Sequence, residues 1–264
     1  MSVPPLLFAL MLWFFGTAMV VWLDSRPSAT FRTSFRWAGI VALGAMGVVA
    51  WSARDGSVGA AYTGFAAAIT VWGWHELGFL MGFVSGPRHA PCPPDARGWA
   101  RFRLATATVI HHEVALAVTV ALLFALTWGQ PNQTAPLTFA LLFGMRLSAK
   151  LNLFLGVPSL SDETFPEHLA YLKTYFKKAR CNWLYPFSIS FGAGVTWWAW
   201  TAAEAAANPG PNPGTAASYT LVAGLAALGV VEHVLLALPI RDAMMYRWAS
   251  PQPVKAKTIM TEQR

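Results

Sequence analysis

The sequence has 264 residues, of which 55% are hydrophobic and 12% are charged. A soluble domain carries about a quarter charged residues, so this composition excludes an ordinary soluble globular domain. The net charge of +7 is explained by membrane topology and contact with anionic lipid, and it requires no nucleic-acid partner.

Seven apolar segments are long enough to cross a bilayer as helices, which takes about 20 residues. Their residues do not alternate between apolar and polar, as the strands of a membrane barrel would. The expected fold is therefore an all-α integral membrane bundle of about seven transmembrane helices. In chain order the predicted helices are Pro4–Leu23, Trp37–Ala53, Ala60–Val84, Leu104–Trp128, Pro136–Leu155, Leu184–Ala203 and Ala216–Ile240. Residues 1–248 are expected to form a single polytopic membrane domain, followed by a flexible cytoplasmic tail at 249–264.

Basic residues are concentrated in alternate loops. Of the 19 Lys and Arg residues, only Arg54 falls on the side opposite to the others. The positive-inside rule makes the basic side cytoplasmic, which predicts an N-terminus outside and a C-terminus in the cytoplasm. An odd number of helices agrees with this orientation.

The longest inner loop, residues 156–183, is predicted to contain an amphipathic helix. Pro166 stands at a favourable first helical position, and Leu169, Leu172 and Phe176 follow at helical spacing, beside several lysines. A basic amphipathic helix lying at the membrane interface explains this pattern, and a helix that docks a partner is the alternative.

Ionisable side chains within the predicted spans are the candidate functional residues, because they are costly in a bilayer. The third, fourth and seventh spans contain His75, Glu76, His111, His112, Glu113, Glu232 and His233. At 1.5 Å per residue, His111 and His233 each lie about 12 Å from the nearest cytoplasmic Arg along the chain, and His75 lies roughly 16 Å from the expected end of its helix. We therefore expect these three spans to bring His and Glu to a similar depth.

Four interpretations of these residues remain open. Imidazole and carboxylate ligands suit iron, zinc or manganese, and Glu163, Glu167 and His168 of the inner loop could complete such a site. Alternatively, His75, His111, His112 or His233 could ligate the metal of a tetrapyrrole. The groups could instead pair with one another and join helices, or they could form a proton or ion path. The Glu-x-x-His repeat of soluble di-iron bundles is absent from these spans.

Several blocks of the sequence carry a family resemblance. They are 72-WGWHELGFLMGFVSGPR-88, 108-TVIHHEVAL-116, 142-LFGMRLSAKLNLFLGVPSLSDETFPEHLAYLKTYF-176 and 181-CNWLYPFSI-189. The chain resembles the photosynthetic complex assembly proteins of the PuhE type, which anoxygenic phototrophic bacteria encode near the gene for the reaction-centre H subunit.

The resemblance implies a multi-pass protein of the bacterial inner or intracytoplasmic membrane. Such a protein would act in photosystem assembly or bacteriochlorophyll supply, with reaction-centre, light-harvesting or pigment-synthesis proteins as partners. The resemblance does not identify catalytic or ligand residues in this chain. A function suggested by the residues alone is an integral-membrane metal-dependent oxidoreductase acting on a pigment or lipid. A transporter is the weakest hypothesis, because the outer halves of these spans contain almost no ionisable groups.

Overall fold

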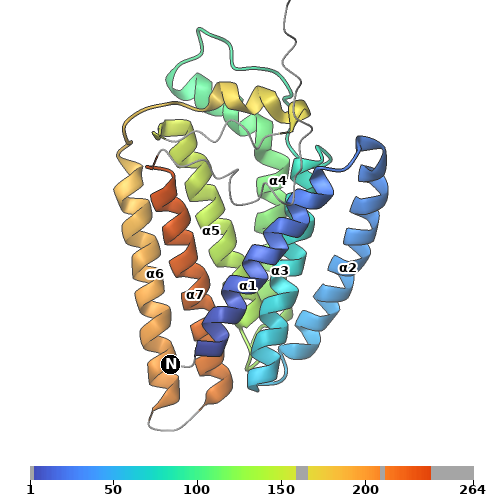
Figure 1. Cartoon of the computed structure of the whole chain (residues 1–264), viewed down its shortest axis with the longest axis vertical. Coiled ribbons are helices and arrows are strands. Elements are labelled where there is room, and N and C mark those ends of the chain that lie inside the picture. The colour runs from blue at the N-terminus through green and yellow to red at the C-terminus, as the bar shows by residue number, and fades with distance from the viewer. Residues whose placement is uncertain (1–2, 159–165, 209–211, 239–264) are drawn as a thin grey trace, which may run out of the picture.

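The computed structural model describes residues 3–158, 166–208 and 212–238, and within them the protein is helical with no strand. Its long helices are α1 (Val3–Asp24), α2 (Phe31–Ser52), α3 (Val58–Leu80), α4 (Gly98–Leu126), α5 (Thr134–Leu155), α6 (Leu184–Ala207) and α7 (Pro213–Leu235). They run up and down in one bundle, and the short 3₁₀ helices are η1 (Ser28–Thr30) and η2 (Glu167–Tyr175). In Figure 1, η2 lies across the upper end of the bundle.

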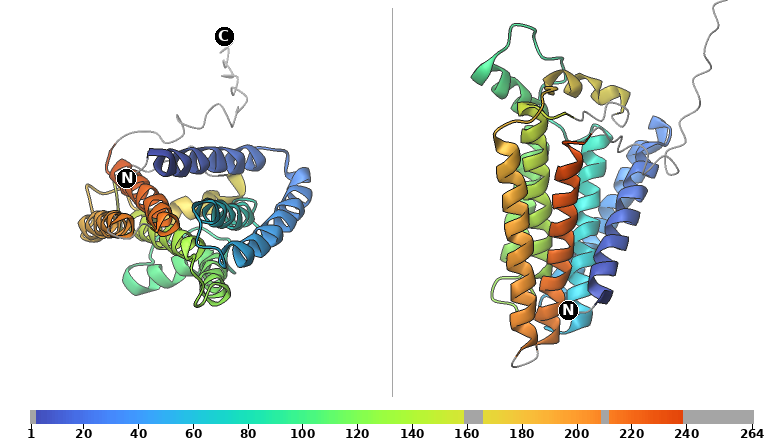
Figure 2. Two further views of the ribbon diagram at one scale, coloured as in Figure 1. Left: turned by 90° about the horizontal axis from the view of Figure 1, so that it is seen from below. Right: turned by 60° about the vertical axis from the view of Figure 1, so that its left-hand side comes forward.

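The helix α3 occupies the middle of the bundle. It packs against α1, α2, α4, α5 and α7, and the view from below in Figure 2 shows it inside the ring that they form. Small residues such as Gly64, Ala67 and Ala68 let these neighbours approach its backbone closely. Side chains on α3 therefore face several helices at once.

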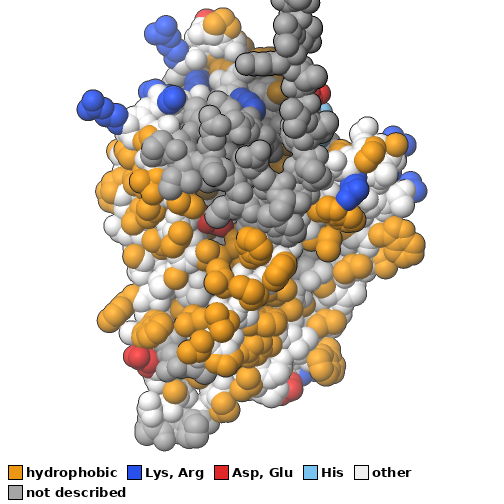
Figure 3. All heavy atoms as spheres, in the orientation of Figure 1, with side chains coloured by type: hydrophobic (Ala, Val, Ile, Leu, Met, Phe, Trp, Pro, Cys, Tyr) orange, Lys and Arg blue, Asp and Glu red, His pale blue; other side chains and the backbone are white. Residues whose placement is uncertain are grey.

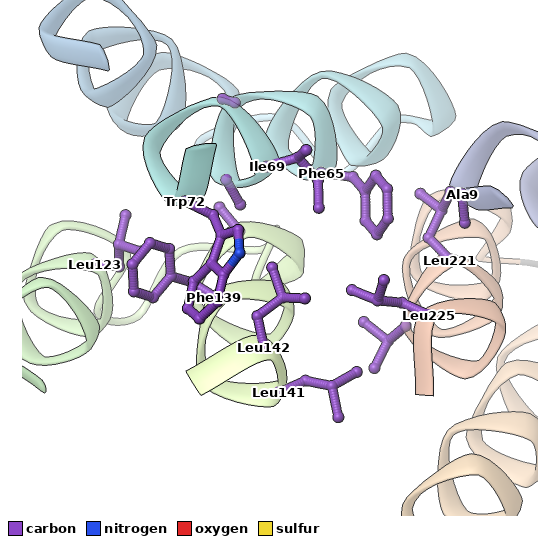
Figure 4. Packing of buried hydrophobic residues seen from close by; sticks show 14 of the residues in the cluster. Ala9, Phe65, Ile69, Trp72, Leu123, Phe139, Leu141, Leu142, Leu221 and Leu225 are labelled. Atoms are coloured by element: carbon purple, nitrogen blue, oxygen red, sulfur yellow. The ribbon is translucent and has the colours of Figure 1, made fainter. Parts of the chain in front are cut away.

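The hydrophobic core lies between α3, α5 and α7. Phe65 and Trp72 of α3 meet Phe139 of α5 and Leu221 and Leu225 of α7 (Figure 4). The rings of Trp72 and Phe139 meet edge to face, with their centroids 5.4 Å apart. This core holds the three helices in fixed rotation about their axes, which determines where their polar residues point.

The outer surface of the bundle is largely apolar. Large side chains such as Leu43, Val118 and Phe191 are exposed on it, and Figure 3 shows hydrophobic side chains along the length of the helices, with Lys and Arg gathered mainly at the end that carries η2. In the described part of the chain, α1, α2, α4, α5 and α7 are each long and apolar enough to cross a membrane. The protein is thus built as a multi-pass membrane protein.

Two predicted helix starts were placed too late. The second helix begins at Phe31, six residues before the predicted Trp37, and the fourth begins at Gly98, six residues before Leu104. Both predictions stopped at arginines, yet arginines at the end of a membrane helix extend their heads to the interface while their stems remain on the helix. The third helix is shorter than predicted, since it ends at Leu80 and not at Val84.

The inner loop contains a 3₁₀ helix, η2, within the segment where an amphipathic helix was predicted. Leu169 and Leu172 are buried against Phe79 at the end of α3, so these apolar side chains pack on the protein itself. Four contacts fasten the 3₁₀ helix: Tyr175 accepts from Arg88, His168 bonds Leu80, Thr174 accepts from the amide of Cys92, and Arg101 donates to the carbonyl of Tyr175. The segment thereby forms a cap over this end of the bundle.

Candidate ion-pair cluster between α3, α4 and α5

Two ion pairs lie side by side between three central helices. Arg146 of α5 donates through Nη2 to Oε2 of Glu76 on α3, at 2.9 Å. Lys150, four residues further along α5, donates to Glu113 on α4. Residues four apart lie on one face of a helix, so α5 presents both cations to the two carboxylates. We call Glu76, His112, Glu113, Arg146 and Lys150 the ion-pair cluster.

His112 lies at the centre of this cluster. It is completely buried, and its Nε2 is 3.9 Å from Oε1 of Glu76, which is too far for a hydrogen bond. Its ring packs on Phe79, with centroids 4.8 Å apart, and Nζ of Lys150 lies 4.8 Å from the centre of the same Phe79 ring. Phe79 thus connects the cluster to the leucines of η2.

Several polar atoms of the cluster are buried without a hydrogen-bond partner among the described residues. They are Oε1 of Glu76, both ring nitrogens of His112, Oε2 of Glu113 and Nε of Arg146. More than nine-tenths of buried polar groups in proteins are hydrogen-bonded, so such a concentration is unusual. The unused atoms include both donors and acceptors, which matches water or another small group that can both donate and accept.

The loop after α3 positions His112 through the backbone. The amide of His112 donates to the carbonyl of Ser85 at 3.0 Å, and the amide of Arg88 donates to the carbonyl of Ala107 at 3.1 Å. Gly86 lies between these contacts, and a Cβ at this position would be 2.3 Å from the oxygen of Ala107. Only glycine allows the loop to lie this close to α4.

The other predicted residues of α3 and α7 lie outside this cluster. His75 is hydrogen-bonded to Thr119 of α4, with 2.9 Å between Nε2 and Oγ1. His233 is hydrogen-bonded to Ser148 of α5 at 3.0 Å and to the carbonyl of Gly229 at 2.9 Å. Glu232 accepts a hydrogen bond of 2.8 Å from Trp13, which ties α7 to α1. These contacts join helices pairwise.

The remaining predicted residues are dispersed. His111 is exposed on α4, and Glu167 is exposed at the start of η2. His168 is bonded to the carbonyl of Leu80 at 2.7 Å, away from the ion pairs. Glu163 falls outside the described residues. Among the described residues, His111, Glu167 and His168 thus lie apart from the ion-pair cluster, and their role as ligands stays a prediction. His111 and His112 have different surroundings because adjacent residues on a helix point about 100° apart.

The sequence reasoning did not identify the partners of the carboxylates. Glu76 and Glu113 were expected to pair with histidine or to bind a metal, and Arg146 and Lys150 of the fifth span were not among the candidate residues. The four-residue spacing of two cations within an apolar helix was the available signal. A second missed feature is the chain of amide and hydroxyl contacts among Ser148, Asn152, Ser188 and Asn182, which joins α5 to α6 and to the segment before it.

The cluster as placed does not fit a metal ion. Each carboxylate is already neutralised by a cation, and a metal would have to displace Arg146 or Lys150. Within the described residues, no group of three or more His, Cys, Asp and Glu side chains could hold a metal. Metal or tetrapyrrole ligation consequently remains a prediction from sequence, while the geometry favours ion pairing between helices.

Comparison with known proteins gives two matches. A family model described as "Protein of unknown function (DUF3623)" matches residues 1–257. A relative from Rhodobacter capsulatus, named "Uncharacterized 30.4 kDa protein in puhA 5'region", is 36% identical over 246 residues, which cover 90% of this chain and 87% of the relative. No solved structure matches the chain.

Proposed function

Because the chain belongs to the family described as Protein of unknown function (DUF3623), and a relative is named for the puhA 5' region, we propose a role in photosynthesis. The protein is a multi-pass factor of the PuhE type that serves assembly of the photosynthetic apparatus or modulates bacteriochlorophyll supply. The location of the relative in a photosynthesis gene region is the observation that carries this proposal.

The proposed topology has seven spans in the bacterial inner or intracytoplasmic membrane, with the N-terminus outside and the η2 end in the cytoplasm. The helices α3 and α6 have 23 and 24 residues, which is enough to cross a bilayer of about 30 Å. Tryptophan, glycine and polar residues lower their hydropathy, but α3 is enclosed by its neighbours and needs little contact with lipid. Reporter fusions at residues 54 and 130, expected outside, and at 90 and 170, expected inside, test this topology.

The ion-pair cluster is the part of the molecule through which we propose that it acts. Charged side chains inside a membrane are retained where they have a function or pair with one another, and this cluster contains unused donors and acceptors beside its ion pairs. Metal-dependent oxidation of a pigment or lipid has less support, because the carboxylates it would use are held by Arg146 and Lys150.

Deletion of the gene in a phototrophic host tests the function. We expect a lower yield of assembled reaction-centre or light-harvesting complexes, or a changed bacteriochlorophyll content, restored by the wild-type gene. Absorption spectra of membranes measure both quantities. If the deletion strain keeps wild-type absorption spectra and wild-type growth under phototrophic conditions, the proposal is wrong. This conclusion does not depend on the results for variants of the ion-pair cluster.

A further inference from the structure

A cleft of about 450 Å³ lies at the basic end of the bundle, next to the ion-pair cluster but lined by other residues. Its walls come from the start of α2, the loop after α3 and η2, and its volume is within the usual range for small-ligand sites. We propose that this cleft binds a phosphate-bearing headgroup. The inference does not depend on the proposed role in photosynthesis.

Two histidines give the cleft its hydrogen-bonding capacity. Nε2 of His168 must donate to the carbonyl of Leu80, because a carbonyl only accepts, and this bond fixes the orientation of the ring. His89 is held through Nε2 by the hydroxyl of Ser85 at 3.0 Å. Both rings line the cleft, and among the described residues their hydrogen bonds are made through Nε2. Nδ1 of His89 can carry a proton and donate to a phosphate oxygen while its Nε2 accepts from Ser85. Nδ1 of His168 can donate only when the imidazole carries both protons, in which case the bond is charge-assisted.

The start of α2 places no acidic side chain of its first turn beside the cleft. Ser28 and Phe31 line the cleft where η1 leads into α2. Neither Pro27 nor Thr30, which precede η1 and α2, makes a side-chain cap, and the first turn of α2 contains no acidic residue. The amides of Thr30 and Phe31 donate to the carbonyls of Pro27 and Ser28, so neither is free for a ligand. The lack of an acidic residue in the first turn is the feature of this end that is compatible with a negative charge.

Aromatic side chains beside the cleft favour an amphiphile over a soluble ion. Phe31, which lines the cleft, packs edge to face on His168, and Phe35 one turn further along α2 contacts Phe83, with ring centroids 5.0 Å apart. Phe83 is 42% exposed, so this row of rings reaches the outer surface of the bundle. A headgroup in the cleft would have its hydrocarbon chain beside these rings.

One acidic side chain near the cleft disfavours the binding of an anion, and its substitution provides a control. Asp24 at the end of α1 interacts electrostatically with His168. Removing this negative charge strengthens the binding of phosphate if the cleft takes an anion, and weakens binding if it takes a cation. The substitution Asp24→Asn thus reports the sign of the ligand's charge.

Native mass spectrometry of the full-length protein in detergent tests the site, with phosphatidylglycerol, diacylglycerol and inorganic phosphate as probes. We expect the wild type to retain phosphatidylglycerol in preference to diacylglycerol. The double variant His89→Gln/His168→Gln should lose roughly tenfold in affinity, and Asp24→Asn should gain affinity. His111→Gln, which changes an exposed histidine outside the cleft, is the matched control and should behave as the wild type.

Competition experiments identify the source of the phosphate. Displacement of the lipid by millimolar inorganic phosphate would support the site and assign it to a soluble phosphate compound, whereas no displacement assigns it to a lipid headgroup. Equal retention of phosphatidylglycerol by the double variant, at an unchanged unfolding temperature, would overturn the proposal. Weaker binding by Asp24→Asn would overturn it as well. If the double variant unfolds, His89→Gln alone serves, because it leaves the bond from His168 to Leu80 intact.

Discussion

Lys150 of α5 pairs with Glu113 of α4 in the interior of the bundle, with side-chain exposures of 19% and 13%. The two residues are 37 positions apart in the chain and are brought together by the packing of α5 between α3 and α4. Each charge is tolerated at this depth because the other is present. The pair therefore stabilises the packing of α5 against α4, and it is also part of the candidate functional site.

Removing one partner of this pair should be worse than removing both. Lys150→Met leaves the carboxylate of Glu113 buried without its cation, which should cost about 3 kcal/mol of unfolding free energy. The double variant Lys150→Met/Glu113→Gln removes both charges and should recover most of this loss. Thermal unfolding in detergent compares the wild type, Lys150→Met, Glu113→Gln and the double variant, and additive effects of the two substitutions would contradict the pairing.

The helices could be predicted from sequence because their signal is local. A run of about 20 apolar residues indicates a span wherever it occurs, and all seven long helices lie where such runs were found. The predicted starts after Arg36 and Arg103 were less accurate, because an arginine near a helix end belongs to the helix while its charge reaches the interface.

The partners of the buried residues could not be predicted in the same way. Glu76 could have faced a histidine, a metal or a cation, and the choice depends on the rotation of α3 set by Phe65 and Trp72 in the core. The contact between Ser85 and His112 depends on a loop whose course only the folded chain defines. The sequence identifies which ionisable residues lie within apolar spans, but the pairing among them is a property of long-range packing.

The close approach of the loop to α4 predicts a strong effect at Gly86. A Cβ there would lie 2.3 Å from Ala107 O, so Gly86→Ala must push the loop away and weaken the hydrogen bond from the amide of His112 to the carbonyl of Ser85. Overpacking of this kind costs about 1–3 kcal/mol. Gly144→Ala on α5, where nothing lies within 4 Å, is the control and should not destabilise the protein. Unfolding temperatures compare the two, and equal values would refute the close contact.

His112 offers a test that separates stability from function. Both of its ring nitrogens are buried without partners among the described residues, so His112→Phe removes two unsatisfied polar atoms and keeps an aromatic ring against Phe79. We expect an unfolding temperature equal to or above that of the wild type. We also expect His112→Phe to fail in restoring photosynthetic complexes to a deletion strain, whereas His111→Phe restores them. A marked loss of stability would instead show that the nitrogens have a bound partner.

The contact between Ser148 and His233 should contribute modestly to stability. Ser148 connects His233 on α7 to Ser188 on α6, with distances of 3.0 and 2.9 Å. Hydrogen bonds between membrane helices contribute about 0.6 kcal/mol on average and about 1.7 kcal/mol at most. Ser148→Ala should therefore lower the free energy of unfolding by about 1 kcal/mol, well below the effect of Lys150→Met. A loss as large as that of the ion-pair variant would mean that His233 is the more critical polar residue, and that the functional site belongs between α5, α6 and α7.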